Sequence, residues 1–467
     1  ALCPDELDRL ADVLEGALAR MPVLRDVGIT TVIRGPISYP RDGAPRVGAR
    51  PGKRNAYCII GLRGGVGAGG GHGWLVAQQI VHGAACHDPW VLDPRRFAGH
   101  GNAELTALKA IEDYQNEFRF HYPHEHRPAG RPIKTTPLTP ILAAEGAHFG
   151  LVNGWERSEY IKPSIDFKET YSFRFNEVFD VVSGEVAAVH NGVGLTEVNG
   201  FNRIELKGSD VSRFLNRMLC GRVPRKLGKV GLGYLLNHHG MLKGEATIAN
   251  LPDGLVWYGS AAASEDHDLD WLLSQLQPDE DVQIRSLTNE HTLLVLAGPK
   301  SRDVLRCVSR SDWSANAFPW LSVRRCFIGI APSVVMSVSF SGELAYEIHV
   351  PNNQLNAAYV ALRQAGERYG LKLFGSRAIE AMRLEKGFLH WKSDILTEFD
   401  PFETGLARFV KIDKGQFIGR SALVERLGQR PRKSLVTLKI HCDHAPAHGG
   451  ASVYASGKLV GTVTSAE

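Results

Sequence analysis

SFSGELAYEIHV, residues 339–350, is a glycine turn followed by a strand that carries a carboxylate among apolar residues. Successive side chains of a strand point to opposite faces, so Glu347 shares a face with Ala345, while Tyr346 and Ile348 share the other. The face with Tyr346 and Ile348 is predicted to pack in the core. On the other face, Glu347 can accept two N–H bonds side by side, the arrangement that recognises an aminopyrimidine edge. A surface acid is the alternative interpretation.

A second acidic strand lies upstream in HGMLKGEATI, residues 239–248. The pattern is typical of a hairpin tip followed by a strand in which Glu245 alternates with residues that face apolar surroundings. A carboxylate at the edge of an apolar pocket can bind an amine nitrogen or stabilise positive charge that develops on it. An exposed acid at a strand edge is the alternative, and the pattern alone favours it.

Residues 377–385 have the period of a helix, and their apolar side chains are predicted to pack. Arg383 shares a turn of this helix with Glu380. An intrahelical ion pair explains Arg383 without further assumptions, whereas contact with a ligand carboxylate requires help from elsewhere in the chain.

A glycine-rich run, residues 64–71, lies between a predicted strand at 55–60 and a predicted helix from Trp74 to Val81. Within it, the G-x-G-x-x-G pattern is a candidate for binding a phosphate-containing cofactor. A dinucleotide fold also needs a further strand that ends in an acid about 20 residues on, but a Pro-rich segment follows here. We therefore expect a loop that closes a cofactor domain, with close backbone packing beside the cofactor or another strand. The glycines that form the pattern are Gly65, Gly67 and Gly70.

Length and composition predict a protein with about three domains and enough apolar residues to form their cores. The chain has 467 residues, is 43% hydrophobic and has a formal net charge of +4 that is spread along its length. Neither nucleic acid nor a membrane is an expected partner, because there is no basic tract and no run of about 20 apolar residues. The acidic first residues are unlike a secretory signal. We therefore expect a soluble, cytoplasmic protein that acts on a small molecule.

The order of predicted elements indicates an α+β fold. Strands and helices alternate without an internal repeat over residues 166–426, and a Pro-, His- and Arg-rich segment precedes them. A basic linker follows, and then strands are predicted at 435–440 and 460–465. Because the first residues already have a helical pattern and the last predicted strand has no partner after it, we expect a fragment cut at both ends. The predicted domains are 1–93, 94–164, 165–427 and 428–467.

Two histidine clusters lie in Pro- or Gly-containing loops and lack acidic or thiol partners at the spacing that zinc sites show. Seven scattered cysteines form no C-x-x-C pair. We therefore predict no metal site and no disulfide framework. The histidines are His121, His124 and His126, and then His441, His444 and His448.

In their order along the chain, several motifs resemble the folate-binding aminomethyltransferase fold of the glycine cleavage system. These are Gly240–Ile248, S-x-x-G-E-x-x-Y-E at 339–347, MRLEKG at 382–387, Asp394, PFETG at 401–405 and KGQFIGR at 414–420. Upstream motifs resemble the end of an amine-oxidising flavin domain and its connector, and the joined architecture is that of the dimethylglycine and sarcosine dehydrogenase family. The upstream motifs are Gly35-Pro36, Asp42-Gly43, the glycine run, DPRRF at 93–97 and GWER at 154–157.

This resemblance implies a remnant of a flavin domain at 1–93, a connector at 94–164, a large aminomethyltransferase-like folate-binding domain at 165–427 and the start of a C-terminal β-barrel at 428–467. It implies FAD and tetrahydrofolate as cofactors. FAD would take a hydride from an N-methyl amine such as dimethylglycine or sarcosine, and tetrahydrofolate would capture the one-carbon unit. Oxygen or an electron-transfer flavoprotein would accept the electrons. Because the family's dinucleotide loop lies upstream of Ala1, the chain alone is not expected to oxidise an amine.

The resemblance also implies roles for individual residues. Glu245 would be the catalytic acid that faces the reactive folate nitrogens, although the aminomethyltransferases have Asp there. Glu347 would hold the pterin ring. The wall of the folate pocket would include Arg383, Tyr234 and Trp391.

Two other readings stay open. One is a non-catalytic regulatory relative that resembles the pyruvate dehydrogenase phosphatase regulatory subunit, which has the same architecture. The other is a stand-alone folate-dependent aminomethyltransferase, for which residues 1–160 would have no purpose. Retention of both Glu245 and Glu347 favours an enzyme over the regulatory reading.

Overall fold

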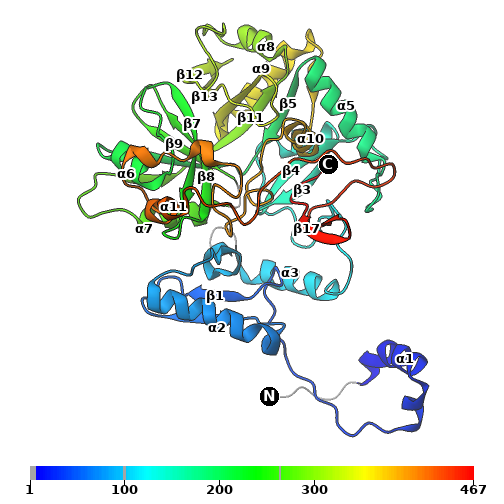
Figure 1. The fold of residues 1–467 in the computed structure, drawn as a ribbon. Helices are drawn as coiled ribbons and strands as arrows, with labels where there is room; N and C mark the ends of the chain where they lie inside the picture. Colours follow the sequence, from blue (N-terminus) through cyan, green and yellow to red (C-terminus); the bar gives the residue numbers. More distant parts are fainter. Residues whose placement is uncertain (1–6, 98–100, 262–263, 467) are drawn as a thin grey trace. The chain divides into compact units, whose positions relative to one another are not determined.

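The computed structural model describes residues 7–97, 101–261 and 264–466, which divide into two units (Figure 1). The first contains Ala1–Ala85, Val91–Pro94 and Asn102–Glu117, and the second contains Cys86–Trp90, Arg95–Gly101 and Phe118–Glu467. In the described residues, no helix has the length and apolar character needed to span a membrane.

The first unit is built from short helices and one β-hairpin. The hairpin pairs β1 and β2 antiparallel, and the side chain of Asn102 accepts a hydrogen bond from the backbone N–H of Leu105 at 2.7 Å and so caps α3. Its elements are η1 (Leu7–Leu10), α1 (Ala11–Arg20), η2 (Pro22–Asp26), β1 (Arg46–Ala49), β2 (Tyr57–Ile60), α2 (Gly65–His82) and α3 (Ala103–Gln115).

The glycine run forms a helix, so the predicted glycine loop is wrong. Helix α2 begins at Gly65 and includes Gly67 and Gly70 before it ends at Gly83, whose φ of 75° is left-handed. Glycine disfavours a helix by about 1 kcal/mol relative to alanine but does not forbid one, and helix-forming residues follow the run. A Cβ added at Gly65, Gly67 or Gly70 would meet no described atom within 4 Å, so the expected close packing is also absent from the described residues.

Two antiparallel sheets form most of the second unit (Figure 1). The five-stranded sheet has the order β10-β6-β9-β8-β7. Its strands are β6 (Asn202–Lys207), β7 (Lys229–Leu236), β8 (Leu242–Asn250), β9 (Val256–Ser260) and β10 (Gln283–Ser286). The six-stranded sheet has the order β12-β13-β14-β11-β5-β15, with β15 parallel to β5. Its strands are β5 (Gly194–Val198), β11 (His291–Ala297), β12 (Val323–Ile328), β13 (Ala331–Met336), β14 (Ala345–Pro351) and β15 (Lys372–Leu373).

Helices cover one face of each sheet. Helices α6 and α7 pack on the five-stranded sheet, whereas α8 and α9 pack on the six-stranded sheet. The hairpin of β3 and β4 lies against α5 and α10. The helices are α4 (Thr139–Ala144), α5 (Val178–Asn191), α6 (Val211–Met218), α7 (Glu265–Ser274), α8 (Ser301–Val308), α9 (Leu355–Glu367), α10 (Ser376–Glu385) and α11 (Arg420–Arg426); β3 is Ala147–Val152 and β4 is Trp155–Ile161.

Alternation along the strands decides which side chains face the helices. On β14, Tyr346 and Ile348 are buried in the core beneath α8 and α9, as predicted, so Glu347 lies on the other face. On β8, Ala246 and Ile248 pack toward α6 and α7, which leaves Glu245 on the other face of that sheet. The faces that the helices leave uncovered pack against each other and form a separate core cluster. This cluster includes Ala249 and Trp257 from one sheet and Val323, Val334 and Met336 from the other.

One predicted strand does not form in the described residues. Leu435–Ile440 has irregular backbone without a sheet partner. A β-branched run stays a strand only where a neighbouring strand takes its backbone hydrogen bonds. Near the end of the chain, β16 (Ser452–Ala455) pairs with β17 (Lys458–Thr462) as a hairpin. The C-terminal β-barrel and the four-domain division stay predictions.

Candidate functional site

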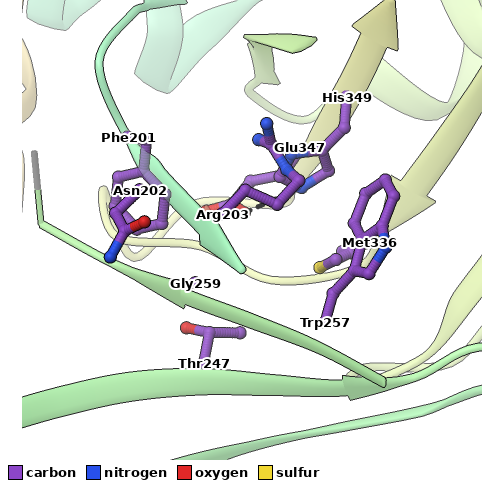
Figure 2. Close-up of a pocket in the computed structure, with 9 residues that line it drawn as sticks. All are labelled: Phe201, Asn202, Arg203, Thr247, Trp257, Gly259, Met336, Glu347 and His349. Atoms are coloured by element: carbon purple, nitrogen blue, oxygen red, sulfur yellow. Dashed lines mark hydrogen bonds and ion pairs between the residues drawn. The ribbon is translucent and has the colours of Figure 1, made fainter. Parts of the chain in front are cut away.

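A pocket lies where the uncovered faces of the two sheets meet (Figure 2). The five-stranded sheet contributes side chains from β6, β8 and β9, and the six-stranded sheet contributes side chains from β13 and β14. The lining residues are Phe201, Asn202, Arg203, Thr247, Trp257, Gly259, Met336, Glu347 and His349. The enclosed space is about 10 Å³, which is room for about one water molecule.

Glu347 on β14 is the acidic side chain in this pocket. Burial raises the pKa of its carboxyl to about 7, although the charge of Arg203 acts in the opposite direction. In the part of the chain that the structure describes, the carboxylate accepts no hydrogen bond, and Nε2 of His349 lies 3.5 Å from its Oε2. The pocket therefore contains a carboxyl group with free acceptor capacity that changes charge near neutral pH.

Arg203 and His349 form the basic side of the pocket. The Arg203 guanidinium donates a hydrogen bond to Nδ1 of His349, as the dashed line in Figure 2 marks, and to the backbone oxygen of His291 at 3.4 Å. Its carbon lies 5.4 Å from the centre of the Trp257 ring, which is within cation–π range. Burial lowers the pKa of Arg203 to about 10, so Arg203 stays charged at neutral pH.

Glu245 on β8 faces the same side of its sheet as Thr247, which lines the pocket two residues further along. Glu245 pairs across the ladder with Tyr234 on β7, whose hydroxyl favours the ionised form of the Glu245 carboxyl. Burial raises the pKa of Glu245 to about 7, and the Tyr234 hydroxyl opposes this shift. Burial also raises the pKa of Tyr234.

The structure therefore supplies two half-buried carboxyl groups on the facing sides of two sheets. Glu347 lines the pocket. Glu245 does not line it and lies two residues along β8 from the lining residue Thr247. A carboxyl group whose pKa is near 7 can accept N–H bonds when ionised and can give up a proton when neutral. A bicyclic ring is larger than the enclosed space, so the lining side chains must move apart to admit one.

The other predicted wall residues do not line this pocket. Trp391 is buried with Tyr234 in a neighbouring apolar cluster, and its indole N–H donates to Oγ of Ser264 at 3.1 Å. Arg383 is 1% exposed and bonds Asp394 at 2.6 Å and Glu380. The ion pair with Glu380 is the one that the helical spacing predicted, and with Asp394 it engages both terminal nitrogens of the guanidinium, while Nε has no partner in the described residues.

Of the nine lining residues, sequence reasoning named only Glu347 as a site residue, and the missed ones include Arg203, Trp257 and His349. The period of two that placed Glu347 also places His349 on the same face, which was an available signal. Arg203 lies between an asparagine and an apolar residue in a short strand, and a buried arginine cannot be distinguished from an exposed one in such a pattern.

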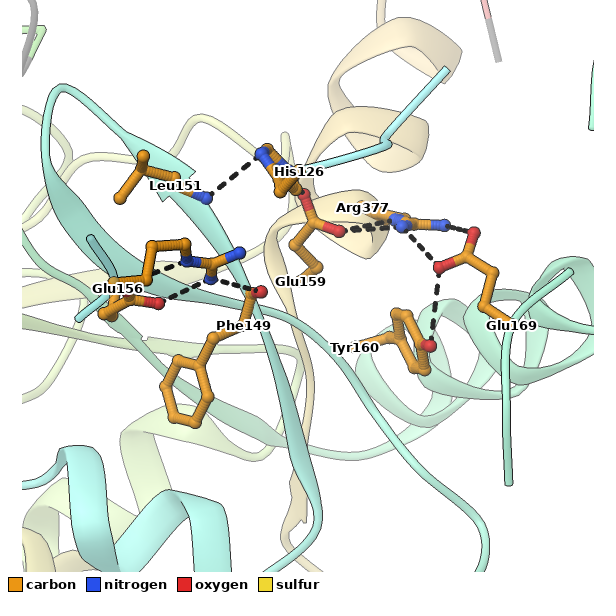
Figure 3. Close-up of polar contacts among 9 residues, drawn as sticks. His126, Phe149, Leu151, Glu156, Glu159, Tyr160, Glu169 and Arg377 are labelled. Carbon is orange, nitrogen blue, oxygen red and sulfur yellow. Dashed lines mark hydrogen bonds and ion pairs between the residues drawn. The ribbon is translucent and has the colours of Figure 1, made fainter. Parts of the chain in front are cut away.

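A separate polar cluster joins α10 to the β3–β4 hairpin (Figure 3). Arg377 of α10 bonds Glu159 of β4 at 2.7 Å and Glu169 at 2.7 Å, and Glu159 also bonds Nε2 of His126 at 2.7 Å. The hydroxyl of Tyr160 lies 3.5 Å from Glu169. The guanidinium bonds with both carboxylates, so the cluster holds elements together and presents no open binding position.

A buried histidine ties the segment Cys86–Trp90 to α7. Nε2 of His267 lies 2.7 Å from Asp88, and Nδ1 lies 2.9 Å from Asp268. Lys243 Nζ also lies 3.2 Å from Nε2 of His267. Burial alone would lower the pKa of His267, but the charge of Asp88 and the bonds to both carboxylates raise it overall. With the imidazole charged, both of its nitrogens donate to carboxylates.

This arrangement predicts how stability depends on pH. The pKa of His267 is raised on folding, so its contribution is complete below the unfolded-state pKa and is lost as pH rises through the folded-state pKa. We expect the urea midpoint of the chain to fall as pH is raised from about 6 to 9. His267→Gln should flatten this part of the profile, whereas the exposed His239→Gln should keep it. Parallel profiles for the wild type and His267→Gln would contradict the prediction.

No group of three or more His, Cys, Asp or Glu in the described residues is placed to hold a metal ion. The first unit also shows no flavin cradle within its described residues, because the three glycines of the pattern lie inside α2 with open space beside them.

Residues 138–414 match the family model of the GCVT N-terminal domain, and residues 82–136 match that of the FAD dependent oxidoreductase central domain. Mitochondrial dimethylglycine dehydrogenase of Mus musculus is 32% identical over 467 residues, which are 99% of this chain and 54% of that protein. The mitochondrial pyruvate dehydrogenase phosphatase regulatory subunit of Mus musculus is 27% identical over 476 residues, with 99% and 54% covered. The chain thus spans about half the length of these relatives.

The crystal structure of glycine cleavage system aminomethyltransferase T from Bartonella henselae superposes with a TM-score of 0.59 at 22% identity. The match covers 71% of this chain and 85% of that one. It confirms the predicted aminomethyltransferase-like fold of mixed helices and strands. The matches in sequence likewise confirm the resemblance to dimethylglycine dehydrogenase and its relatives.

Proposed function

Because the chain belongs to the family of the GCVT N-terminal domain, we propose that the pocket beside Glu347 binds the pterin head of a reduced folate. One observation carries this proposal most directly. Glu347 is a half-buried carboxyl group with unused acceptors, and it lies in the pocket between two sheets of the matched region. The 2-amino and ring N–H groups of a pterin are a pair of adjacent donors that one carboxylate can accept.

Within this proposal the two acids have different tasks. Glu347 orients the pyrimidine edge, and Glu245 lies further along β8, where it would face the nitrogens that receive the one-carbon unit. Tetrahydrofolate supplies the nucleophilic nitrogen when bound. Glu245 holds or releases a proton at its carboxyl oxygen, and the Tyr234 hydroxyl favours the ionised form of that carboxyl.

For the longer protein we propose an FAD- and folate-dependent oxidation of an N-methyl amine such as dimethylglycine or sarcosine. The match of residues 82–136 to the oxidoreductase central domain and the identity to dimethylglycine dehydrogenase support it. Joining the two activities in one protein would keep the reactive one-carbon unit away from water. In this proposal the present chain carries the folate half of the reaction. The electron acceptor and the cytoplasmic location stay predictions.

Calorimetric titration of the 467-residue chain with 5-formyltetrahydrofolate, a stable reduced folate, tests the folate site. We expect a saturable heat with one site per chain and a rise in the thermal unfolding temperature, since a ligand that binds the folded state stabilises it. Absence of both effects in a chain that unfolds cooperatively would refute the folate site. The oxidase activity is tested on the longer protein, by anaerobic bleaching of its flavin absorbance with dimethylglycine. No bleaching would favour the regulatory reading.

A further inference from the structure

Arg203 is a buried cation whose side-chain hydrogen-bond partner is a histidine rather than a carboxylate. It is 2% exposed, and in the described residues no carboxylate oxygen lies within 4.0 Å of its nitrogens. A buried charge is normally paired, because leaving it alone in a low-dielectric site is costly. Its side-chain partner is His349, and beyond His349 lies Glu347.

The contact with Arg203 decides the tautomer of His349. A guanidinium only donates hydrogen bonds, so Nδ1 of His349 must accept, and the proton of the neutral ring is on Nε2. Burial and the nearby charge of Arg203 also lower the pKa of His349, which keeps the ring neutral. The ring therefore presents an N–H group on the side away from Arg203.

An acceptor lies near that N–H group, but the distance between them is slightly too long for a hydrogen bond. Nε2 of His349 is buried and makes no hydrogen bond with the described residues, and Oε2 of Glu347 lies 3.5 Å from it. Ordinary N–H···O bonds span about 2.7–3.2 Å, so a small rotation of either side chain would form the bond. Both residues project from the same face of β14, two positions apart.

We propose that His349 is a positioning residue of the folate site proposed above: held by Arg203, it donates Nε2–H to one oxygen of Glu347 and turns the remaining acceptors toward the ligand. This inference rests on the proposed function and names what the site selects. The ligand class is a pyrimidine with two adjacent N–H donors. A ring that lacks the 2-amino group leaves one acceptor of Glu347 unpaired and binds more weakly.

The net charge of the trio formed by Arg203, His349 and Glu347 supports this role. Arg203 is positive, His349 is neutral and Glu347 is negative when ionised, so the trio is neutral overall and a neutral pterin adds no charge. The charged or titratable groups that act on His349 are Arg203 and His291, and Arg203 also favours the ionised carboxylate of Glu347. Neither of them donates a hydrogen bond to Glu347 in the described residues.

The test compares His349→Leu with His349→Gln in the full 467-residue chain without ligand. The carboxyl titration of Glu347 is followed by carbon NMR of chain labelled at the glutamate carboxyl carbon, with Glu347→Gln to assign the signal. His349→Leu should raise the titration midpoint by about one pH unit, because the ionised form loses its donor. His349→Gln should restore it, because an amide can accept from Arg203 and donate to Glu347. His291→Leu is the matched control: this histidine contacts the same Trp257 ring and is expected to leave the midpoint unchanged.

A second measurement uses the wild type and needs no variant. The nitrogen chemical shifts of His349 should show the neutral Nε2–H tautomer throughout the range in which Glu347 titrates. An Nδ1–H tautomer, or a midpoint that is unchanged or lower in His349→Leu, would overturn the inference. If the chain binds 5-formyltetrahydrofolate, its preference over the 2-desamino analogue should shrink in His349→Leu and return in His349→Gln. If the wild type binds neither compound, the proposed function fails while the titration still decides the role of His349.

Discussion

Replacing Arg377 with methionine will lower the free energy of unfolding by about 3–5 kcal/mol, because it leaves two carboxylates without their cation. Arg377 is 6% exposed and bonds both Glu159 and Glu169 at 2.7 Å (Figure 3). Burial alone would raise the pKa of Glu159, but bonds from His126 and Arg377 lower it to about 2. The native state therefore keeps an ionised carboxylate that depends on these partners, and methionine supplies only the volume of the lost side chain.

Urea unfolding of wild type and variant at neutral pH measures this effect. The exposed ion pair of Arg306 with Asp303 at 3.0 Å is the control, and Arg306→Met should change stability by at most about 1 kcal/mol. Adding Glu159→Gln and Glu169→Gln to Arg377→Met should recover part of the loss, since the uncompensated charges are then removed. A loss below about 1 kcal/mol for Arg377→Met would show that the cluster in Figure 3 is solvated rather than buried.

Local periodicity predicted the faces of the site strands because a strand alternates regardless of its partners. It placed Tyr346 and Ile348 in the core, Glu347 on the opposite face and Arg383 beside Glu380, and all three placements hold. The errors concern features that depend on distant residues. Leu435–Ile440 has the composition of a strand but no neighbour to pair with, and the glycine run adopts a helix that its composition disfavours.

The pocket likewise combines features that a single stretch of sequence predicts with features that depend on distant residues. Glu245 and Glu347 could each be identified as site candidates from the pattern of their own strand. The hydrogen bond from Arg203 to His349 could not, because it joins β6 to β14 across 146 residues of sequence. Nothing local marks Arg203 as buried, because its environment is created by the approach of the second sheet. The neutral state of His349 is likewise set by a residue far away in the sequence, and so the tautomer could not be read from the stretch that contains it.

Glu347→Ala should weaken the binding of 5-formyltetrahydrofolate by about 2–5 kcal/mol, which is about 30- to 4,000-fold in Kd. The variant removes the acceptor of the pocket and leaves two donors of the pterin unpaired, while Arg203 loses a carboxylate that stabilises its charge. Because the pKa of Glu347 is raised to about 7 in the free chain, wild-type affinity should also fall as pH drops below about 7. Calorimetric titrations at several pH values measure both effects.

Glu343 provides the matched control for this substitution because it lies in the same stretch but outside the pocket. Its carboxylate pairs with Lys386 at 3.0 Å, so Glu343→Ala should leave folate affinity unchanged. Glu347→Gln keeps the size of the side chain, yet its amide would place a donor against the donors of the pterin, so it should bind about as weakly as Glu347→Ala. It should also lose most of the fall in affinity below neutral pH, because the carboxyl group that contacts the pterin is no longer there to titrate. Wild-type affinity in a folded Glu347→Gln chain would mean that the folate, if bound, sits elsewhere.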